Sequence, residues 1–367
     1  MTHRPTLLAL ATDAFGGRGG IAQYNRDLLR ALAEDWRIEI APRYAPDPLP
    51  DLPASLVQRR PRAGRVRYAI GALVAAAAQR PRAIWCGHLY MAPLAAGLAR
   101  MFGCRLLLQL HGIEAWCRPS PRQIVALKAA DAVFCVSRYT RAQILGHAAL
   151  DPARVWVLPN TVGSQFTPGA RAAARQRLAM RDAPMLLTVG RLAAAERYKG
   201  HDDTLRAVAQ LQAEGRQLTY LIAGDGDDRP RLEALSAELG IGAAVRFTGA
   251  IAPADLPDLY RAADLFVMPS RGEGFGISFL EALACGTPVI GLAVAGAVDP
   301  LALLNDDDGR ALDTDDGPPQ IAQAISEMLQ RTQSEAAAQR RHQRVDRAFG
   351  QAAFGARARA LLAGIDR

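Results

Sequence analysis

Residues Met268 to Gly291 read MPSRGEGFGISFLEALACGTPVIG, and this stretch decides the fold class. It starts at the end of an apolar run, Leu265 to Met268, and passes through a glycine-rich loop into a segment of helical period that Gly286 closes. A second apolar run, Pro288 to Gly291, follows directly. Strand, glycine loop, helix and strand in this order predict a βαβ unit, and hence a parallel sheet covered by helices.

The same alternation extends along the whole chain. Its 367 residues exceed what one hydrophobic core usually serves. We therefore predict an α/β protein with two doubly wound, Rossmann-like domains. The expected strands are Leu7–Ala11, Arg37–Ile40, Ala83–Cys86, Leu106–Leu110, Ala132–Val136 and Val155–Leu158, then Met185–Val189, Thr219–Ala223, Val245–Phe247, Leu265–Met268 and Pro288–Gly291.

One segment fits a connection between the domains. Pro159 to Pro184 has prolines at both ends and a polar middle rich in Ala and Arg. This places an N-terminal domain in residues 1–165, a C-terminal domain in residues 166–345 and a last segment in residues 346–367.

Cysteine usage and apolar runs bear on the compartment. The five cysteines are widely spaced and include no C-x-x-C pair, which predicts neither a disulfide framework nor a zinc site and favours a reducing cytoplasm. The longest apolar stretch, Ala69 to Ala78, is too short to span a bilayer. The first residues also lack the pattern of a signal peptide, so we expect a cytoplasmic protein.

Charge is distributed unevenly. Residues 1–165 hold 21 Lys and Arg against 10 Asp and Glu, whereas residues 166–367 hold 23 against 26. The basic first half favours contact with an anionic surface, which would be nucleic acid, membrane or an acidic substrate. No recognition helix, aromatic stacking motif or zinc module accompanies the charge, so a nucleic-acid-binding protein is a remote alternative.

The glycine loop carries two carboxylates that suit a nucleotide sugar. Its glycines let a ligand approach the backbone, and the helix from about Ile277 offers free N–H groups to phosphate. Glu273 in the loop and Glu281 on the helix can accept hydrogen bonds from sugar hydroxyls on either side of a diphosphate. A plain turn followed by a solvated helix would have the same composition.

These residues resemble retaining glycosyltransferase family 4, whose signature places two glutamates around an EGFG sequence and an E-A-x-x-G-x-P-V sequence. Glu273, Gly274, Phe275, Gly276, Glu281, Ala282, Gly286, Pro288 and Val289 all match it. The resemblance implies that the first glutamate binds donor-sugar hydroxyls and the second binds the ribose.

A second match is VGRLAAAERYKGHDDTLRAV, residues 189–208. Arg191 and Lys199 resemble the family's two pyrophosphate-binding cations, although their spacer, Ala193 to Tyr198, is longer than in many members. Two fixed cations would stabilise the charge of a diphosphate leaving group without a metal. Without this context, two such residues are more often solvated surface charges.

Two places in the first half complete the candidate site. A glycine loop follows the first strand, and the resemblance directs Gly19 and Gly20 toward the donor phosphates and the acceptor. His111 follows a buried strand, at the sheet edge where ligands bind in such folds. The resemblance places this histidine near the donor sugar, whereas a lone histidine is more often structural.

The resemblance covers nearly the whole chain and implies the GT-B fold, with two Rossmann-like domains facing a central cleft and the last helix returning to the first domain. It implies transfer of a hexose from a UDP- or GDP-sugar to an acceptor hydroxyl with retention, in synthesis of bacterial cell-envelope polysaccharide, lipopolysaccharide or glycolipid. The predicted catalytic residues are His111, Glu273, Arg191 and Lys199, and the predicted donor-binding residues are Gly19, Gly20, Arg191, Lys199, Gly274, Phe275, Gly276 and Glu281. A phosphorylase or nucleotide-sugar epimerase of the same architecture is the alternative.

Acidic clusters raise the question of a metal. Asp225 and Asp227 form a D-x-D triplet, which can hold a divalent cation in sugar transferases of another fold. Because G-D-G after a strand is also expected as a turn, we predict no metal and no cofactor besides the nucleotide sugar substrate. We expect Asp306 to Asp308 to form a solvated loop.

Basic residues gather around one apolar segment, which reads QRRPRAGRVRYAIGALVAAAAQRPR from Gln58 to Arg82. Ile70, Leu73, Val74 and Ala77 share a helical face that we expect to be buried on the sheet. Arginines beside an amphipathic helix favour anionic membrane surfaces, so we predict peripheral docking on the inner face of the membrane and a lipid-linked or saccharide acceptor. The arginines are Arg59, Arg60, Arg62, Arg65, Arg67, Arg80 and Arg82.

Overall fold

The computed structural model describes residues 4–180 and 183–365. The chain divides into two compact units, unit 1 with Met1–Thr161 and Gln351–Arg367, and unit 2 with Val162–Gly350. These boundaries lie a few residues from those placed after residues 165 and 345. Residues 1–3, 181, 182, 366 and 367, which the predicted domains and the connection Pro159–Pro184 include, lie outside the described residues.

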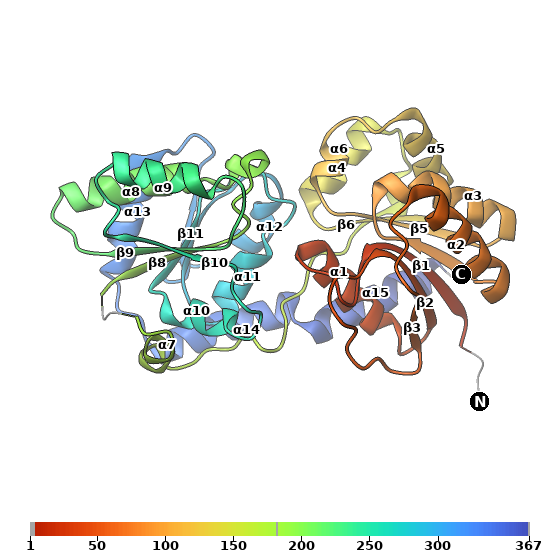
Figure 1. Cartoon of the computed structure of the whole chain (residues 1–367), viewed down its shortest axis with the longest axis horizontal. Coiled ribbons are helices and arrows are strands. Elements are labelled where there is room, and N and C mark those ends of the chain that lie inside the picture. Colours follow the sequence, from red (N-terminus) through yellow and green to blue (C-terminus); the bar gives the residue numbers. More distant parts are fainter. Residues whose placement is uncertain (1–3, 181–182, 366–367) are drawn as a thin grey trace. The chain divides into compact units, whose positions relative to one another are not determined.

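Unit 1 contains a parallel sheet in the order β3-β2-β1-β4-β5-β6-β7 (Figure 1). Its strands are β1 (Thr6–Asp13), β2 (Arg37–Tyr44), β3 (Leu56–Gln58), β4 (Ala83–Cys86), β5 (Arg105–Leu110), β6 (Ala132–Cys135) and β7 (Val155–Val157). Its helices are α1 (Gly20–Leu32), α2 (Arg65–Gln79), η1 (Leu89–Met91), α3 (Ala92–Phe102), α4 (Ile113–Trp116), α5 (Pro121–Ala129), α6 (Arg138–His147), η2 (Pro152–Arg154) and α15 (Gln351–Ile365).

Both faces of this sheet are covered. Leu8 and Leu10 of β1 belong to a buried cluster with side chains of α2, α3 and α5. Because successive strand residues point to opposite faces, Leu7 and Ala9 face the other side, and both are fully buried. There α1 packs on β1 and α15 packs along α1, so unit 1 has two helical layers around one sheet.

Unit 2 repeats this architecture with the order β10-β9-β8-β11-β12-β13, again all parallel (Figure 1). Its strands are β8 (Met185–Val189), β9 (Thr219–Ala223), β10 (Val245–Gly249), β11 (Leu265–Met268), β12 (Val289–Leu292) and β13 (Gly309–Leu312). Its helices are α7 (Arg171–Arg177), η3 (Ala194–Lys199), α8 (His201–Ala213), α9 (Arg229–Glu238), α10 (Leu256–Ala262), α11 (Ile277–Ala284), η4 (Ala295–Ala297), α12 (Val298–Leu301), α13 (Pro318–Leu329) and α14 (Glu335–Phe349).

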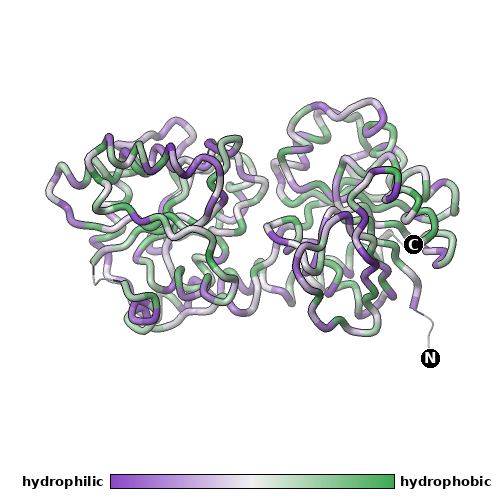
Figure 2. The backbone as a smooth tube through the Cα atoms, in the orientation of Figure 1, coloured by the Kyte–Doolittle hydropathy of each residue, from purple (hydrophilic) through white to green (hydrophobic). Residues whose placement is uncertain are grey.

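Apolar side chains line the strands of each unit. In unit 2, Leu186, Ile222 and Val267 pack with side chains of α8, α9 and α13. Figure 2 shows the same pattern over each unit, with hydrophobic colour along the central strands and hydrophilic colour on the outer loops. The two sheets with helices on both faces confirm the predicted pair of doubly wound α/β domains.

All the predicted strands are present, and two strands were missed. The missed strands, β3 and β13, lie at the outer edges of the two sheets. Each has only three or four residues, LVQ and GRAL. With so few residues, neither segment gives a periodicity signal of its own, whereas the equally short edge strand β7 belongs to the longer apolar run Val155–Leu158.

The expected orientation of α2 is wrong. Ile70, Leu73 and Val74 were expected on the sheet, yet their exposed fractions are 54%, 39% and 52%. The buried face instead carries Tyr68, Gly71, Ala72, Ala75 and Ala76. Small side chains let the helix lie close to β1 and β2, and this close packing outweighs the larger apolar residues on the other face.

The expected solvated loop at Asp306 to Asp308 is correct for its first two residues and wrong for the third. Asp308 is buried and accepts a hydrogen bond from Nε of the buried Arg341 over 3.1 Å. Arg344 of α14 also donates to Asp308, and Arg341 donates to the Gly286 carbonyl oxygen. The buried carboxylate ties α14 to the start of β13, and Arg341 also ties α14 to the turn after α11. No local sequence pattern indicates either contact.

Among the described residues, no helix is both long enough and apolar enough to cross a membrane.

Candidate functional site

The glycine loop between β11 and α11 has the geometry that a ligand site at a helix start requires. Gly276, the residue before α11, has φ 92° and ψ 58°, a left-handed conformation that favours glycine. A Cβ on Gly272 would lie 3.0 Å from the ring of Tyr198. The loop therefore depends on glycine for its backbone shape, and the first N–H groups of α11 have no partner within their own helix.

The loop is also fixed from behind. The backbone N–H of Gly296 in η4 donates to the carbonyl oxygen of Glu273 over 2.9 Å. A Cβ on Gly296 would lie 2.0 Å from the carbonyl oxygen of Gly274, so only glycine fits at position 296. The side chain of Phe275 is buried and meets the ring of Phe349 edge-on at 5.4 Å. These contacts hold the backbone on either side of the Glu273 side chain.

Glu273 and Lys199 form an ion pair at the carboxyl ends of two adjacent strands. Lys199 Nζ donates to Glu273 Oε1 over 2.9 Å, and only 13% of each side chain is exposed. Burial opposes the charge of Lys199, but its attraction to Glu273 more than offsets that effect and raises the pKa of Lys199 above its usual value. Lys199 is therefore a permanently charged ammonium beside the carboxylate of the glycine loop.

Arg191 is linked to this pair by Glu196, whose carboxylate contacts both Arg191 and Lys199. Its Nη2 donates to Oε1 of Glu196, and Oε2 of the same carboxylate lies 4.0 Å from Lys199 Nζ. Most of the Arg191 side chain is exposed, with 77% accessible to solvent. Two cations thus converge on one small region after β8, where a phosphate group can reach them.

Glu281 lies in the second turn of α11, and its side chain is partly buried. Tyr260 of α10 donates a hydrogen bond from Oη to Glu281 Oε2 over 2.7 Å. Burial raises the pKa of Glu281 to about 7, and the hydrogen bond from Tyr260 offsets only part of that effect. The carboxyl group is therefore poised between its neutral and ionised forms at neutral pH.

In unit 1, His111 directly follows β5, and its ring is held in one tautomer. Nε2 lies 3.0 Å from the carbonyl oxygen of Gly87, which can only accept, so Nε2 carries the proton and Nδ1 keeps a free electron pair. The ring of Tyr24 meets it edge-on at 5.1 Å. Burial lowers the pKa of His111 to about 4, so the ring is neutral at physiological pH.

Gly19 and Gly20 form the start of α1, after β1. Gly19 has φ 87°, and a Cβ there would meet no atom within 4 Å. Both glycines are exposed. The loop before them is tied down by an ion pair between Arg18 and Asp47, so the backbone at the helix start is open but anchored.

Two protein-family models together match most of the chain. The family described as "Glycosyltransferase Family 4" matches residues 18–166, and "Glycosyl transferases group 1" matches residues 183–331. A D-inositol 3-phosphate glycosyltransferase from Catenulispora acidiphila is 31% identical over 327 residues, which cover 78% of this chain and 77% of that protein. The chain belongs to glycosyltransferase family 4.

A further relative and two solved structures extend the comparison. A D-inositol 3-phosphate glycosyltransferase from Geodermatophilus obscurus is 38% identical over 245 residues, which cover 61% of this chain and 52% of that protein. This chain therefore spans about half the length of that relative. Sucrose-phosphate synthase from Thermosynechococcus elongatus has a TM-score of 0.84 at 24% identity, with 99% of each chain covered. HepE from Anabaena in complex with UDP-glucose has a TM-score of 0.78 at 20% identity, with 98% of this chain and all of that chain covered. The structural likenesses establish the GT-B fold.

The residues predicted for the family 4 site fall into two groups. In unit 2, direct contacts join Lys199 to Glu273 and, through Glu196, to Arg191, while Gly274, Phe275, Gly276 and Glu281 lie on the same loop and helix. His111, Gly19 and Gly20 belong to unit 1. Their roles toward a donor stay predictions, because no ligand contact tests them.

Two further residues, Glu196 and Tyr260, contact the predicted site residues and were not predicted. Glu196 lies inside the long spacer between Arg191 and Lys199, and an acidic residue between two cations was the available signal. Tyr260 lies in α10 and contacts Glu281 from another helix, so only the fold brings the two together. A tyrosine on a buried helix face gives no local sign of a polar partner.

The D-x-D triplet is used for backbone contacts. Oδ1 of Asp227 accepts from the backbone N–H of Ala194 over 2.8 Å, and Oδ1 of Asp225 accepts from that of Gly226. A Cβ on Gly226 would lie 2.1 Å from the Leu192 carbonyl oxygen, so this is a tight turn that needs glycine. In the described part of the chain, no group of three or more His, Cys, Asp or Glu side chains is placed to hold a metal ion.

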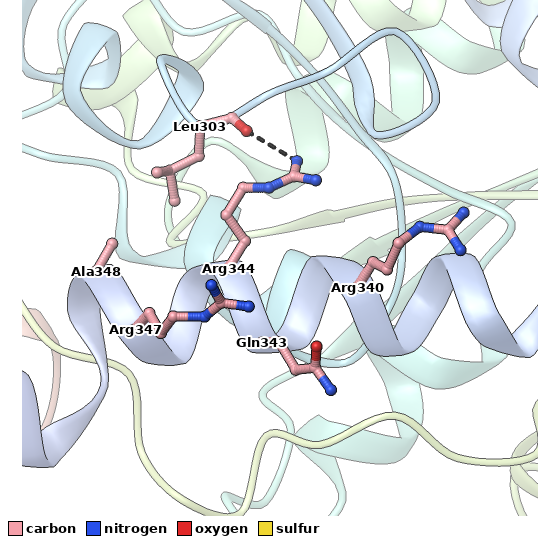
Figure 3. A pocket seen from close by; sticks show the side chains of 6 residues that line it. All are labelled: Leu303, Arg340, Gln343, Arg344, Arg347 and Ala348. Atoms are coloured by element: carbon pink, nitrogen blue, oxygen red, sulfur yellow. Dashed lines mark hydrogen bonds between the residues drawn. The ribbon is translucent and has the colours of Figure 1, made fainter.

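A hollow of about 480 Å³ lies away from these residues, on α14 (Figure 3). Its lining residues are Leu303, Arg340, Gln343, Arg344, Arg347 and Ala348. In Figure 3, Arg344 points toward Leu303 and donates to its carbonyl oxygen over 3.1 Å. The Arg340 and Arg347 side chains are exposed, and none of the lining residues belongs to the candidate site.

Proposed function

We propose that this chain transfers a hexose from a nucleoside diphosphate sugar to an acceptor hydroxyl with retention of configuration. The observation that carries the proposal is the pair formed by Lys199 and Glu273 at 2.9 Å, with Arg191 beside it. In this proposal the two cations bind the diphosphate, and the neighbouring carboxylate binds sugar hydroxyls. Relatives named as glycosyltransferases, and a related fold solved with UDP-glucose, support the same reaction class.

The proposed chemistry assigns a role to each group. The bond between the sugar anomeric carbon and the diphosphate oxygen breaks, and its electron pair leaves with the nucleoside diphosphate. The acceptor oxygen bonds to the same carbon, and its proton passes to the leaving diphosphate or to solvent. Arg191 and Lys199 meet the charge that grows on the leaving diphosphate, Glu273 orients donor hydroxyls, and Glu281 binds the ribose.

We propose that the reaction needs no metal, because Arg191 and Lys199 supply the positive charge that a divalent ion would otherwise bring. Turnover should then persist in excess EDTA. A loss that added Mg²⁺ or Mn²⁺ restores would contradict this part of the proposal.

A screen of sugar nucleotides tests the donor. We expect UDP- or GDP-sugars to raise the thermal unfolding midpoint, since a ligand that binds only the folded state stabilises it. Incubation with the stabilising donor and candidate acceptors should release the nucleoside diphosphate and yield a glycoside whose anomeric configuration matches the donor by NMR.

The same measurements separate the alternatives. A phosphorylase would form sugar 1-phosphate from a glycoside and inorganic phosphate, and an epimerase would change the sugar without releasing nucleoside diphosphate. Salt-sensitive binding to arbitrary duplex DNA, with no binding of sugar nucleotides, would favour a nucleic-acid-binding protein.

We propose further that unit 1 docks on an anionic membrane through α2, where a lipid-linked acceptor of envelope synthesis would be found. The face of α2 away from the sheet carries Val66, Ile70, Leu73 and Val74, of which Val66 is 72% exposed. We call these four residues the α2 surface. Residues three and four apart on a helix share one face, so the surface forms a continuous apolar stripe.

Arginines border this stripe on one side. Arg60, Arg62, Arg65 and Arg67 are all exposed. A hollow of about 350 Å³ is lined by Arg62, Arg67 and Ile70 among others, so positive charge and apolar surface meet at one place. Each such arginine contributes on the order of 1 kcal/mol to attraction by an anionic lipid surface. The acceptor side of the membrane would be the cytoplasmic leaflet, with synthesis in the cytoplasm.

Flotation with liposomes of phosphatidylcholine and phosphatidylglycerol tests the docking. We expect binding that falls at high salt and in a variant with Arg60, Arg62, Arg65 and Arg67 changed to Gln. Arg59 stays unchanged because it pairs with the buried carboxylate of Glu39. Val66→Ser with Ile70→Ser should also reduce binding, at any salt concentration.

A matched control removes arginines elsewhere. Arg340→Gln with Arg347→Gln takes two exposed charges from α14 and should leave flotation unchanged. Equal loss in this control would mean that net charge alone drives binding. Flotation that is absent from the start would reject the docking and favour a soluble saccharide acceptor.

A further inference from the structure

Glu196 lies between the two cations proposed for the diphosphate. Its Oε1 accepts a hydrogen bond from Arg191, and its Oε2 lies 4.0 Å from Lys199 Nζ. Only 13% of its side chain is exposed, although the Arg191 side chain it meets is 77% exposed. One carboxylate is thus shared by two cations that reach it from opposite ends of η3.

The segment around Glu196 is itself tied to the glycine loop. The backbone N–H of Arg271 donates to the carbonyl oxygen of Tyr198 over 2.7 Å, and the Tyr198 ring packs where a Cβ on Gly272 would lie. Glu196 interrupts η3 with φ −116° and ψ 28°, and its backbone N–H donates to the Ala193 carbonyl oxygen. The long spacer between Arg191 and Lys199 therefore places a carboxylate at a fixed point beside the loop.

Two cations this close repel each other, and a long exposed arginine side chain loses conformational entropy when it is held in one position. A shared carboxylate offsets the repulsion and restricts the arginine before any ligand arrives. We propose that Glu196 is a positioning residue that holds Arg191 and Lys199 side by side for the diphosphate. This inference rests on the proposed function, because it assumes that these cations bind the diphosphate.

The contact leaves room for the ligand. Arg191 reaches Glu196 through Nη2, and a guanidinium has five N–H groups, so the remaining donors can serve phosphate oxygens at the same time. A carboxylate that blocked the cations would instead weaken diphosphate binding. The two possibilities predict opposite changes in affinity when the carboxylate is removed.

Calorimetric titration with UDP or GDP, whichever the wild-type protein binds, tests the proposal. The free nucleoside diphosphate carries on its β-phosphate the charge that the leaving group gains during transfer. We expect Glu196→Ala to weaken its binding about tenfold, the size of one lost hydrogen bond to a charged group. Glu196→Gln, whose amide oxygen still accepts from Arg191, should lose less. Binding of UMP or GMP should be unchanged in both variants.

A double-mutant cycle shows whether Glu196 acts through Arg191. Glu196→Ala added to Arg191→Ala should cost much less than in the wild-type background. Glu327→Ala is the control. Glu327 lies on α13 and also pairs with an arginine of unit 2, with 3.8 Å between its carboxylate and Nε of Arg310. This control should bind as the wild type does, and circular dichroism should show all variants folded.

Each outcome decides one point. Unchanged or tighter diphosphate binding in Glu196→Ala and Glu196→Gln would overturn the positioning role, and so would an equal loss of monophosphate binding. Additive losses in the cycle would likewise show that Glu196 does not act through Arg191. If Arg191→Ala and Lys199→Ala both leave diphosphate binding unchanged, the proposed function fails, a result distinct from a failure of Glu196 alone.

Discussion

The two glycine-rich loops of this chain occupy equivalent places in their units and differ at the glycine that precedes the helix, Gly276 in unit 2 and Gly19 in unit 1. The loop after β11 is crowded, with Tyr198 beside Gly272 and Phe279 beside Gly276, and it carries a charged pair, Glu273 with Lys199. The turn after β1 ends in Gly19, where an added Cβ would meet nothing within 4 Å. Both use a positive φ at the residue before a helix.

This difference shows that a glycine loop has two separable properties. One is the backbone turn itself, which needs only a residue that tolerates a positive φ. The other is close packing against side chains that fix the loop and its charges. Gly276 has both properties, whereas Gly19 has the first alone, and close packing in the unit 1 loop occurs only earlier, at Gly16 and Gly17. The predictions below alter these properties one at a time.

The largest expected effect comes from charge. Lys199→Ala should lower kcat by about 100-fold, because it removes a cation aimed at charge that develops in the transition state. KM for the donor should change much less, since the ground state carries less charge at that point. Steady-state kinetics with the donor found by screening would measure both constants.

His111→Ala is the corresponding substitution in unit 1, and it removes a neutral ring instead of a charge. Its ring is neutral, so this change should reduce transfer by less than Lys199→Ala does and leave nucleotide affinity unchanged. Full activity in His111→Ala would return this histidine to a structural role. A pure rise of KM in Lys199→Ala would contradict the role given to the cation.

The next largest effects are expected at the two glycines that precede helices. Gly276→Ala should destabilise the fold by about 2–4 kcal/mol, because it adds left-handed strain to a clash with Phe279, whose ring atom would lie 2.7 Å from the new Cβ. Gly19→Ala should cost about 1–3 kcal/mol, the strain alone of a residue other than glycine at φ 87° and ψ 176°. Urea unfolding followed by circular dichroism measures both, and equal losses would mean that packing around Gly276 relaxes freely.

How much the sequence could predict depends on the range of the interactions. The central strands and the glycine loop were predictable because apolar runs and the EGFG segment are local patterns. The orientation of α2 was not, since the choice between its two apolar faces is made by how closely small residues such as Ala72 and Ala75 approach the sheet.

Contacts between residues that are distant in the chain could not be predicted from the sequence either. Asp308 reads as part of an acidic loop, and its burial depends on Arg341 arriving from α14. Tyr260 meets Glu281 across two helices. The long spacer that holds Glu196 was visible, but the carboxylate's contact with Arg191 follows from the shape of η3 rather than from the spacing alone.

The smallest expected effect concerns Glu281, the carboxylate on α11. Its pKa lies at about 7, raised from 4.5 chiefly by burial. Ribose hydroxyls donate hydrogen bonds, and these favour the ionised acceptor, so donor affinity should increase as pH rises through about 7 and level off above it. The probe should be the sugar nucleotide, because the terminal phosphate of a free nucleoside diphosphate titrates near pH 6.

Stability should show the opposite trend, which provides an independent check. A carboxyl whose pKa is raised by folding favours the folded state at low pH. This contribution is lost between pH 4.5 and about 7, because the carboxyl of the unfolded chain ionises over that interval while the buried group still holds its proton. Glu281→Gln should therefore bind the donor more weakly than the wild type above pH 7, with no dependence on pH near 7. As pH rises from 4.5 to about 7, the unfolding midpoint of Glu281→Gln should rise relative to that of the wild type. A wild-type affinity that is flat from pH 6 to 8 would remove Glu281 from the ribose site and leave the Lys199 and Glu273 pair as the donor contact of unit 2.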